Sequence, residues 1–108
     1  MAKVEYCVIG YGRFGGQVAD QLNELGKRVM VIEGDSNLCD KISRLHEIVI
    51  KADATDINAL ADCGVKNVKN IIVGTSEIEN SIMICANLRQ LGCENVIARA
   101  KNQTHERV

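Results

Sequence analysis

The sequence predicts a Rossmann-type α/β fold with a doubly wound parallel sheet, and three observations lead to this prediction. Five short β-rich runs alternate with four segments of helix length. The apolar runs are nearly continuous, as expected for parallel strands that are covered on both faces. A glycine-rich loop, IGYGRFGG, overlaps the end of the first run. With 108 residues, 46% of them hydrophobic, the chain suits one such domain and is too short for two.

The five expected strands are bounded by Gly, Asn, Asp or Ser, which favour turns. They are EYCVIG (5–10), RVMVIE (28–33), EIVIKA (47–52), NIIVG (70–74) and NVIARA (95–100). Because right-handed crossovers join them, we expect the strand order 3-2-1-4-5. After Ala100 the stretch KNQTHERV resembles the start of another helix, with no sixth strand behind it. We therefore expect a single domain that is truncated after its fifth strand.

Four helices are expected between the strands. Their ranges are 13–25, about 36–46, 55–63 and a fourth that begins near Ser76. Apolar residues recur every three or four positions in the first helix, and Gly26 is expected to end it. Ser36 is the expected cap of the second helix, and Thr55 or Asp56 that of the third.

The fourth helix has an unusual apolar pattern. Ser76, with Glu79 three residues later, forms a capping-box pattern at its start. Between Ile78 and Leu91, apolar side chains point almost all round the axis. Such a helix is either deeply buried or shared with a partner subunit.

Composition and charge exclude several classes of partner and activity. A net charge of -1 and three aromatic residues argue against nucleic acid, and no apolar stretch approaches the roughly 20 residues of a membrane-spanning helix. Five cysteines without CxxC spacing lie mostly among apolar residues, which favours a reduced, cytosolic compartment and no metal site. Neither His46 nor His105 is placed for acid–base catalysis, so we assign no catalytic residue.

The glycine-rich loop carries the clearest functional signal. Gly10, Gly12 and Gly15 fit the GxGxxG pattern between a strand and a helix, the context that a phosphate-binding loop requires. The first glycine allows a tight turn, the second lets a phosphate approach the backbone, and the third lets the helix pack closely on the sheet. Arg13 opposes the helix dipole, so its position favours an anionic ligand such as the distal phosphates; the alternative is a solvated surface arginine.

Glu33 ends the second strand about 20 residues after the loop, where an acidic side chain binds the ribose hydroxyls. Its charge would repel a 2'-phosphate by ~1 to 4 kcal/mol at about 4 Å, so NADP is disfavoured. The alternative is that Glu33 merely starts a turn.

Two more loops follow strands and therefore lie at the same edge of the sheet. In KADATD (51–56), Asp53 and Thr55 are candidates to bond the adenine. The residues alone favour the simpler alternative, in which Thr55 or Asp56 is a helix cap. In GTSEIEN (74–80), Gly74 permits a close backbone approach, and Ser76 is a cap under either interpretation.

Together, VIGYGRFGG, VIEGD, KADATD, NIIVGTSEIEN and NVIARAKN resemble the KTN domain, also called RCK or TrkA-N, over essentially the whole chain. The nearest resemblance is to cytosolic regulatory subunits of Ktr/Trk-type bacterial potassium uptake systems. It implies that residues 1–108 form a non-enzymatic, ligand-sensing domain that binds ATP, ADP, NAD or NADH and gates a membrane potassium translocator. It also implies a homo-oligomer, a dimer or an octameric ring, in the cytoplasm. The transporter subunit would hold it at the inner face of the plasma membrane.

The resemblance also assigns ligand contacts. The glycine loop would hold the phosphates, Glu33 the ribose, and Asp53, Ala54 and Thr55 the adenine, while Thr75, Ser76 and Arg99 would close the pocket; the loop residues are Gly10, Tyr11, Gly12, Arg13, Phe14 and Gly15. This chain has Ala52 where members often have glycine, and residues 1–108 do not include the C-terminal ligand-sensing lobe of many members.

Two other functions stay open from the sequence. One is an NAD-dependent oxidoreductase fragment without its catalytic domain, and the other is a redox sensor that compares NADH with NAD in the same pocket. The sequence does not rank ATP against NADH, because both share the adenosine and the first two phosphates.

Overall fold

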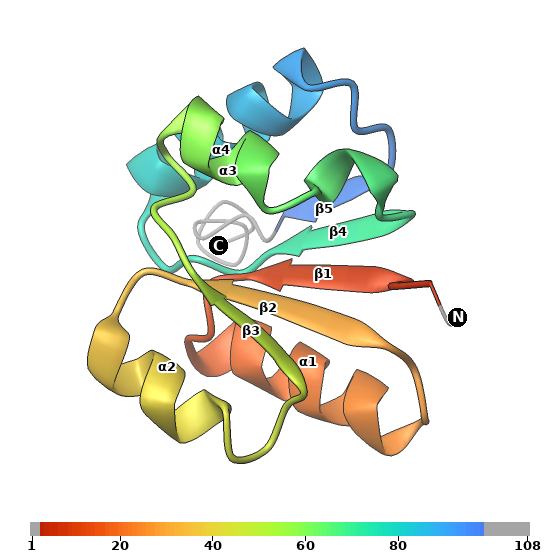
Figure 1. The fold of residues 1–108 in the computed structure, drawn as a ribbon. Helices are drawn as coiled ribbons and strands as arrows, with labels where there is room; N and C mark the ends of the chain where they lie inside the picture. The colour runs from red at the N-terminus through yellow and green to blue at the C-terminus, as the bar shows by residue number, and fades with distance from the viewer. Residues whose placement is uncertain (1–2, 99–108) are drawn as a thin grey trace, which may run out of the picture.

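Five parallel strands form one sheet between two layers of helices in the computed structural model, which describes residues 3–98 (Figure 1). The strands are β1 (Tyr6–Ile9), β2 (Val29–Glu33), β3 (Ile48–Lys51), β4 (Asn70–Val73) and β5 (Val96–Ala98). Their order is β3-β2-β1-β4-β5, which confirms the predicted order. The chain beyond Ala98, with the expected end of the last strand and the tail 101–108, lies outside the described residues.

The helices lie on the two faces of the sheet. They are α1 (Arg13–Glu24), α2 (Ser36–Ile42), α3 (Ile57–Asp62) and α4 (Ile78–Gln90), with a short 3-10 turn η1 (Val65–Asn67) that was not expected. Helices α1 and α2 cover one face, and α3 and α4 cover the other (Figure 1). None of the helices found in residues 3–98 is long and apolar enough to cross a membrane.

The core explains why the apolar runs are continuous. Side chains alternate between the two faces of a strand. In β1, Cys7 and Ile9 pack with Leu60 of α3 and with α4, whereas Val8 packs with α1 and α2. Both faces of β1, β2 and β4 are thus buried.

The expectation of two covered faces is wrong for β5. Ile97 keeps 59% of its surface exposed, although it lies in a strand. Helix α1 packs mainly on β1 and β2, and α2 on β2 and β3, so neither extends over this end of the sheet. The edge strand β5 is therefore covered on one face only, by α4.

Aspartates cap two of the helices, and at α2 this corrects the predicted cap. Asp35 precedes α2, and its Oδ1 atom accepts hydrogen bonds from the N–H groups of Asn37 and Leu38 at 2.9 and 3.3 Å. Ser36 is therefore the first helical residue rather than the cap. Asp56 caps α3 in the same way, which confirms one of the two caps expected for the third helix, and the helix itself begins at Ile57.

The predicted capping box at α4 is also wrong, whereas the predicted end of α1 is confirmed. Glu77 occupies the N-cap position of α4 and makes no side-chain cap bond. Ser76 precedes the N-cap by one residue and therefore does not cap the helix. At the end of α1, Gly26 has a φ of +79°, and the N–H of Lys27 bonds to the carbonyl of Leu22 at 3.0 Å. Gly26 therefore ends α1 in the left-handed backbone conformation, as the sequence predicts.

Candidate nucleotide-binding site

The candidate site lies where the topology of the sheet reverses, between the carboxyl ends of β1 and β4. From β1 the chain turns into α1 on one face, and from β4 it turns into α4 on the other (Figure 1). The N–H of Gly74 bonds to the carbonyl of Ile9 at 2.8 Å, so the two loops start side by side. Crevices at such switch points are where open α/β sheets bind ligands.

The first and third glycines of the loop have the structural roles that the sequence predicts. Gly10 has a φ of +92°, and a Cβ there would come within 2.8 Å of the Thr75 side chain. A Cβ on Gly15 would overlap the carbonyl oxygen of Gly10. Gly10 therefore permits the turn, and Gly15 permits close packing of α1 on the loop.

Gly12 is different, because the protein itself would accept a side chain there. Its φ of -85° is ordinary, and the nearest atom to an added Cβ is the Gly74 carbonyl oxygen at 3.8 Å, a normal contact. Gly12 is also the N-cap residue of α1 and has no side chain with which to cap it. The result is open space in front of a helix N-terminus, the arrangement that binds anions.

Two adjoining hollows, of about 330 and 340 Å³, lie at this edge of the sheet. Gly10, Glu33, Thr75 and Asn80 line both of them. The first is also lined by the predicted adenine residues Asp53, Ala54 and Thr55, and the second by Tyr11, Gly12 and Ser76. The structure thus brings three predicted loops together around a space of the size that small ligands occupy.

Glu33 is fixed in place by two backbone donors. Its Oε1 atom accepts a hydrogen bond from the N–H of Tyr11 at 2.8 Å, and its Oε2 atom accepts one from the N–H of Asp35 at 3.0 Å. A carboxylate can accept about four hydrogen bonds, so capacity for a diol remains. Glu33 therefore takes part in the turn after β2 and also lines both hollows. Its bond to the glycine loop was not expected from the sequence.

The loop after β3 is ordered by its own side chains. The Oδ1 atom of Asp53 accepts hydrogen bonds from the hydroxyl and the N–H of Thr55, at 2.6 and 3.0 Å. These bonds lower the pKa of Asp53. Asn87 of α4 donates from Nδ2 to the carbonyls of Ala54 and Thr55, at 3.1 and 3.0 Å. Sequence reasoning did not identify Asn87, because its partners lie more than 30 residues earlier.

Three predicted loop residues differ from the others in their surroundings. Tyr11 lines the second hollow, but its hydroxyl donates to Asp20 at 2.6 Å. Phe14 packs against the part of the core that contains Val8, on the face of the sheet covered by α1 and α2. Arg13 is the first residue of α1 and is exposed, but it is absent from the lining of both hollows.

The Tyr11 hydroxyl belongs to a small polar network. Asp20 also pairs with the Nε2 atom of the buried His46 at 2.8 Å, and the rings of Tyr11 and His46 pack edge to face. Desolvation and the bond to Asp20 raise the pKa of Tyr11 to about 12. His46, expected at the end of the second helix, instead follows it in a turn.

The site carries charges of both signs. Glu33 and Glu77 line the second hollow together with Gly12, and Asp53 lines the first, whereas the start of α1 carries the positive end of a helix dipole and Arg13. A phosphate group is therefore accommodated best at the start of α1, and hydrogen-bond donors such as ribose hydroxyls beside the carboxylates. Arg99, the remaining predicted contact, lies outside the described residues.

The parallel sheet, its strand order and the glycine turn at the switch point define a Rossmann-type domain. The model of the TrkA-N domain family matches residues 6–108, and the chain belongs to this family. The predicted family resemblance is thereby confirmed.

Known proteins similar to this chain include both sequence relatives and solved structures. An uncharacterized protein of Mycoplasma genitalium is 44% identical over 108 residues, covering 100% of this chain and 48% of that protein. The Ktr system potassium uptake protein C of Bacillus subtilis is 34% identical over 107 residues, covering 98% of this chain and 48% of that protein. The chain thus spans about half the length of these relatives. The structure of the GsuK channel bound to NAD has a TM-score of 0.81 at 18% identity, covering 96% of this chain and 19% of that one.

Proposed function

We propose that this chain is a regulatory, ligand-sensing domain that binds an adenine nucleotide and gates a membrane potassium translocator. The observation that carries the proposal is the pairing of Gly12 with Glu33 across one hollow. Open space before a helix N-terminus suits a phosphate, and a fixed carboxylate suits the two hydroxyls of a ribose. The ligand is ATP, ADP, NAD or NADH, all of which offer both groups.

We extend the proposal to the individual ligand contacts. Backbone groups of the glycine loop and Arg13 hold the phosphates, and Glu33 holds the ribose. Asp53, Ala54 and Thr55 frame the adenine in the first hollow, with Thr75 and Ser76 closing the other side. Arg99 is the remaining contact that we propose. NADP is disfavoured, because the 2'-phosphate would face the Glu33 carboxylate.

The link to potassium uptake rests on the relatives. The Bacillus subtilis protein is named as part of a Ktr potassium uptake system, which favours a regulatory role over an enzymatic one. We therefore place the domain in the cytoplasm, held at the inner face of the plasma membrane by the translocator. The main alternative, an NAD-dependent oxidoreductase fragment, predicts that the full reading frame continues into a substrate domain with an acid–base residue.

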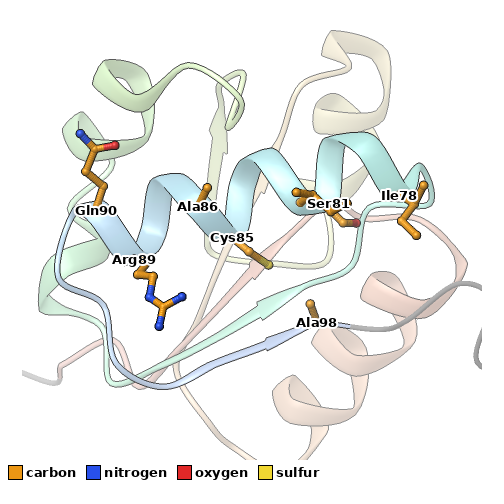
Figure 2. A pocket seen from close by; sticks show the side chains of 8 residues that line it. Ile78, Ser81, Cys85, Ala86, Arg89, Gln90 and Ala98 are labelled. Carbon is orange, nitrogen blue, oxygen red and sulfur yellow. The ribbon is translucent and has the colours of Figure 1, made fainter.

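The exposed face of α4 supports assembly into a homo-oligomer. Ile78, Ile82 and Met83 are 43%, 64% and 52% exposed, so α4 is not deeply buried, and the sharing of α4 with a partner subunit becomes the preferred interpretation. A groove of about 670 Å³ runs between α4 and Ala98 of β5. Figure 2 shows Cys85 and Arg89 pointing from α4 toward this groove. A second copy of the chain is the partner that this face suits, in a dimer or a larger ring.

Gating requires that the nucleotide prefer one subunit arrangement over another, because a ligand shifts an equilibrium only by its differential affinity. The test is calorimetry with ATP, ADP, AMP, NAD, NADH and NADP side by side, followed by transport assays with the reconstituted translocator. We expect binding of the ligands with a free ribose, weak or absent binding of NADP, and transport that changes with the bound nucleotide. Binding without any change in transport would refute the gating role, and no binding at all would refute the proposed function.

A further inference from the structure

Three polar or charged side chains within residues 3–98 are buried, and each is hydrogen bonded, directly or through other side chains, to a different loop of the candidate site. They are His46, Ser81 and Asn87, which keep 5%, 8% and 9% of their surfaces exposed. Burying a polar group is costly unless it is hydrogen bonded. His46 reaches the glycine loop through Asp20 and Tyr11, while Ser81 and Asn87 reach the other two loops from α4.

Asn87 holds the loop after β3. Its Nδ2 atom donates to the carbonyls of both Ala54 and Thr55. Because two carbonyl oxygens can only accept, the amide nitrogen must face them, and both of its protons are used. The hydrogen bonds from Thr55 to Asp53 fix the same loop from within. This loop lines the hollow that we assign to the adenine.

Ser81 holds the loop after β4. Its hydroxyl lies 2.7 Å from the hydroxyl of Thr75 and 3.3 Å from the Thr75 carbonyl oxygen. Thr75 lines both hollows and touches Gly10 of the phosphate loop closely enough to exclude a Cβ there. Helix α4 is therefore fastened to the site at two points, one near each of its ends.

The same helix borders the apolar groove, and Ser81 itself is one of the residues that line it. Ile82, Cys85, Ala86 and Arg89 line it together with Ala98 of β5, and Figure 2 shows Ser81, Cys85, Arg89 and Ala98 around it. Ile84, between Ser81 and Asn87, instead lines the adenine hollow. One rigid element thus contacts the candidate ligand site and the candidate subunit interface.

We propose that Ser81 and Asn87 are positioning residues, which fasten two ligand loops to α4 so that α4 responds to occupancy of the site. This inference rests on the proposed nucleotide binding and deepens it. Without the Asn87 amide, the loop 53–55 would hold its binding-competent conformation for only part of the time. The apparent dissociation constant rises as the inverse of that fraction, so tenfold weaker binding corresponds to one-tenth occupancy of the competent state.

Hydrogen exchange with AMP as the probe tests the inference, because AMP carries the adenine and ribose without distal phosphates. In the wild-type protein, AMP should slow amide exchange in residues 10–13, in 53–56 and throughout α4. In Asn87→Ala, we expect about tenfold weaker AMP binding, with ATP weakened by the same factor. At saturating AMP, protection should remain at residues 10–13 and be lost in α4.

Asn23→Ala is the matched control, because Asn23 also donates from Nδ2 to a backbone carbonyl, that of Leu45 at 3.3 Å, away from the site. This variant should bind AMP within twofold of wild type. Ser81→Ala removes one oxygen atom and serves as the second test if Asn87→Ala does not fold, as judged by circular dichroism. If the site variants match Asn23→Ala in affinity and in α4 protection, the positioning role is wrong. If the wild-type protein binds no nucleotide, the proposed function fails first, and this inference falls with it.

Discussion

The carboxylate of Glu33 accepts a hydrogen bond from the backbone N–H of Tyr11 at 2.8 Å, which joins the end of β2 to the glycine loop. One residue thus sets the position of the loop and presents its charge to the same hollow. The bond explains how the proposed ribose and phosphate contacts keep a fixed separation. It also makes the choice of variant at this position important, because deletion of the side chain would disturb both functions.

Glu33→Gln removes the charge while keeping the bond to the glycine loop. Glutamine has one oxygen that can accept from the N–H of Tyr11, but its amide nitrogen cannot accept from the N–H of Asp35, so that second bond is lost together with the negative charge. We expect NAD binding to weaken, and the affinity for NADP relative to NAD to rise about fivefold or more, because a repulsion of ~1 to 4 kcal/mol is lost. Calorimetry with both dinucleotides gives the ratio. An unchanged ratio would show that Glu33 does not face the 2' position.

Arg13→Ala should weaken ATP binding more than AMP binding. Arg13 lies at the first position of α1, where its charge opposes the helix dipole, so its removal should leave stability unchanged or raise it by ~0.3 to 1 kcal/mol. Arg44→Ala, at another exposed arginine after α2, is the control and should alter neither ligand. Equal losses of ATP and AMP affinity in Arg13→Ala would remove this residue from the distal phosphates.

Gly12→Ala and Gly15→Ala form a pair with opposite expected effects. An added Cβ at Gly12 meets only an ordinary contact, so folding should be nearly unaffected while nucleotide binding falls at least tenfold. An added Cβ at Gly15 overlaps the Gly10 carbonyl, so that variant should lose folding stability first. Thermal unfolding and calorimetry on both variants check this. A Gly12→Ala protein that binds ATP like wild type would argue against phosphate binding beside Gly12.

The contribution of Asp20 to the stability of the protein should be lost in acidic solution, at and below about pH 4. Partial desolvation acts to raise the pKa of Asp20, but hydrogen bonds from Tyr11 and His46 outweigh it, so the pKa is lowered. A lowered folded-state pKa stabilises the fold above the unfolded value of about 3.9, and this contribution is lost as the pH falls through the folded value. Urea unfolding of wild type and Asp20→Asn between pH 7 and pH 3 should show a difference that shrinks at the acidic end. A difference independent of pH would contradict this assignment.

Ile82→Glu should disrupt self-association. Ile82 is 64% exposed on α4 and borders the apolar groove, so a charge there would have to be desolvated in any packed interface. Light scattering at micromolar concentration should show an oligomer for wild type and a smaller species for the variant. Leu25→Glu, at a residue that is 68% exposed beyond the end of α1, is the control and should leave the mass unchanged. A wild-type monomer would contradict the proposed assembly.

The strands and their order in the sheet could be predicted because the sequence signals for them are local. Continuous apolar runs such as VMVIE can be buried on two faces, and helix-length connections allow only parallel pairing with crossovers. The roles of Gly10 and Gly15 were also predictable, because a strand-to-helix turn restricts the backbone in a known way. The start of α2 was harder to predict, because Asp35 and Ser36 are both good N-cap residues. Only the backbone conformation decides which of the two caps the helix.

The parts of the site that the sequence did not predict depend on side-chain direction and on distant contacts. Tyr11 and Phe14 lie in the binding loop, yet one bonds to Asp20 and the other packs in the core. In the sequence, Asn87 is a polar residue within a largely apolar helix and carries no sign of its partner, and only the fold brings it to Ala54. No local pattern encodes a hydrogen bond between residues that are 33 positions apart.

Mapping a bound nucleotide by NMR tests the location of the site most directly. ATP and NAD would each be titrated into the ¹⁵N-labelled protein while backbone amide shifts are followed. We predict that the largest shifts fall on residues 10–14, 53–55 and 74–76, the three loops around the β1/β4 switch point. No shifts with either nucleotide, or shifts confined to the groove between α4 and β5, would contradict nucleotide binding at this site.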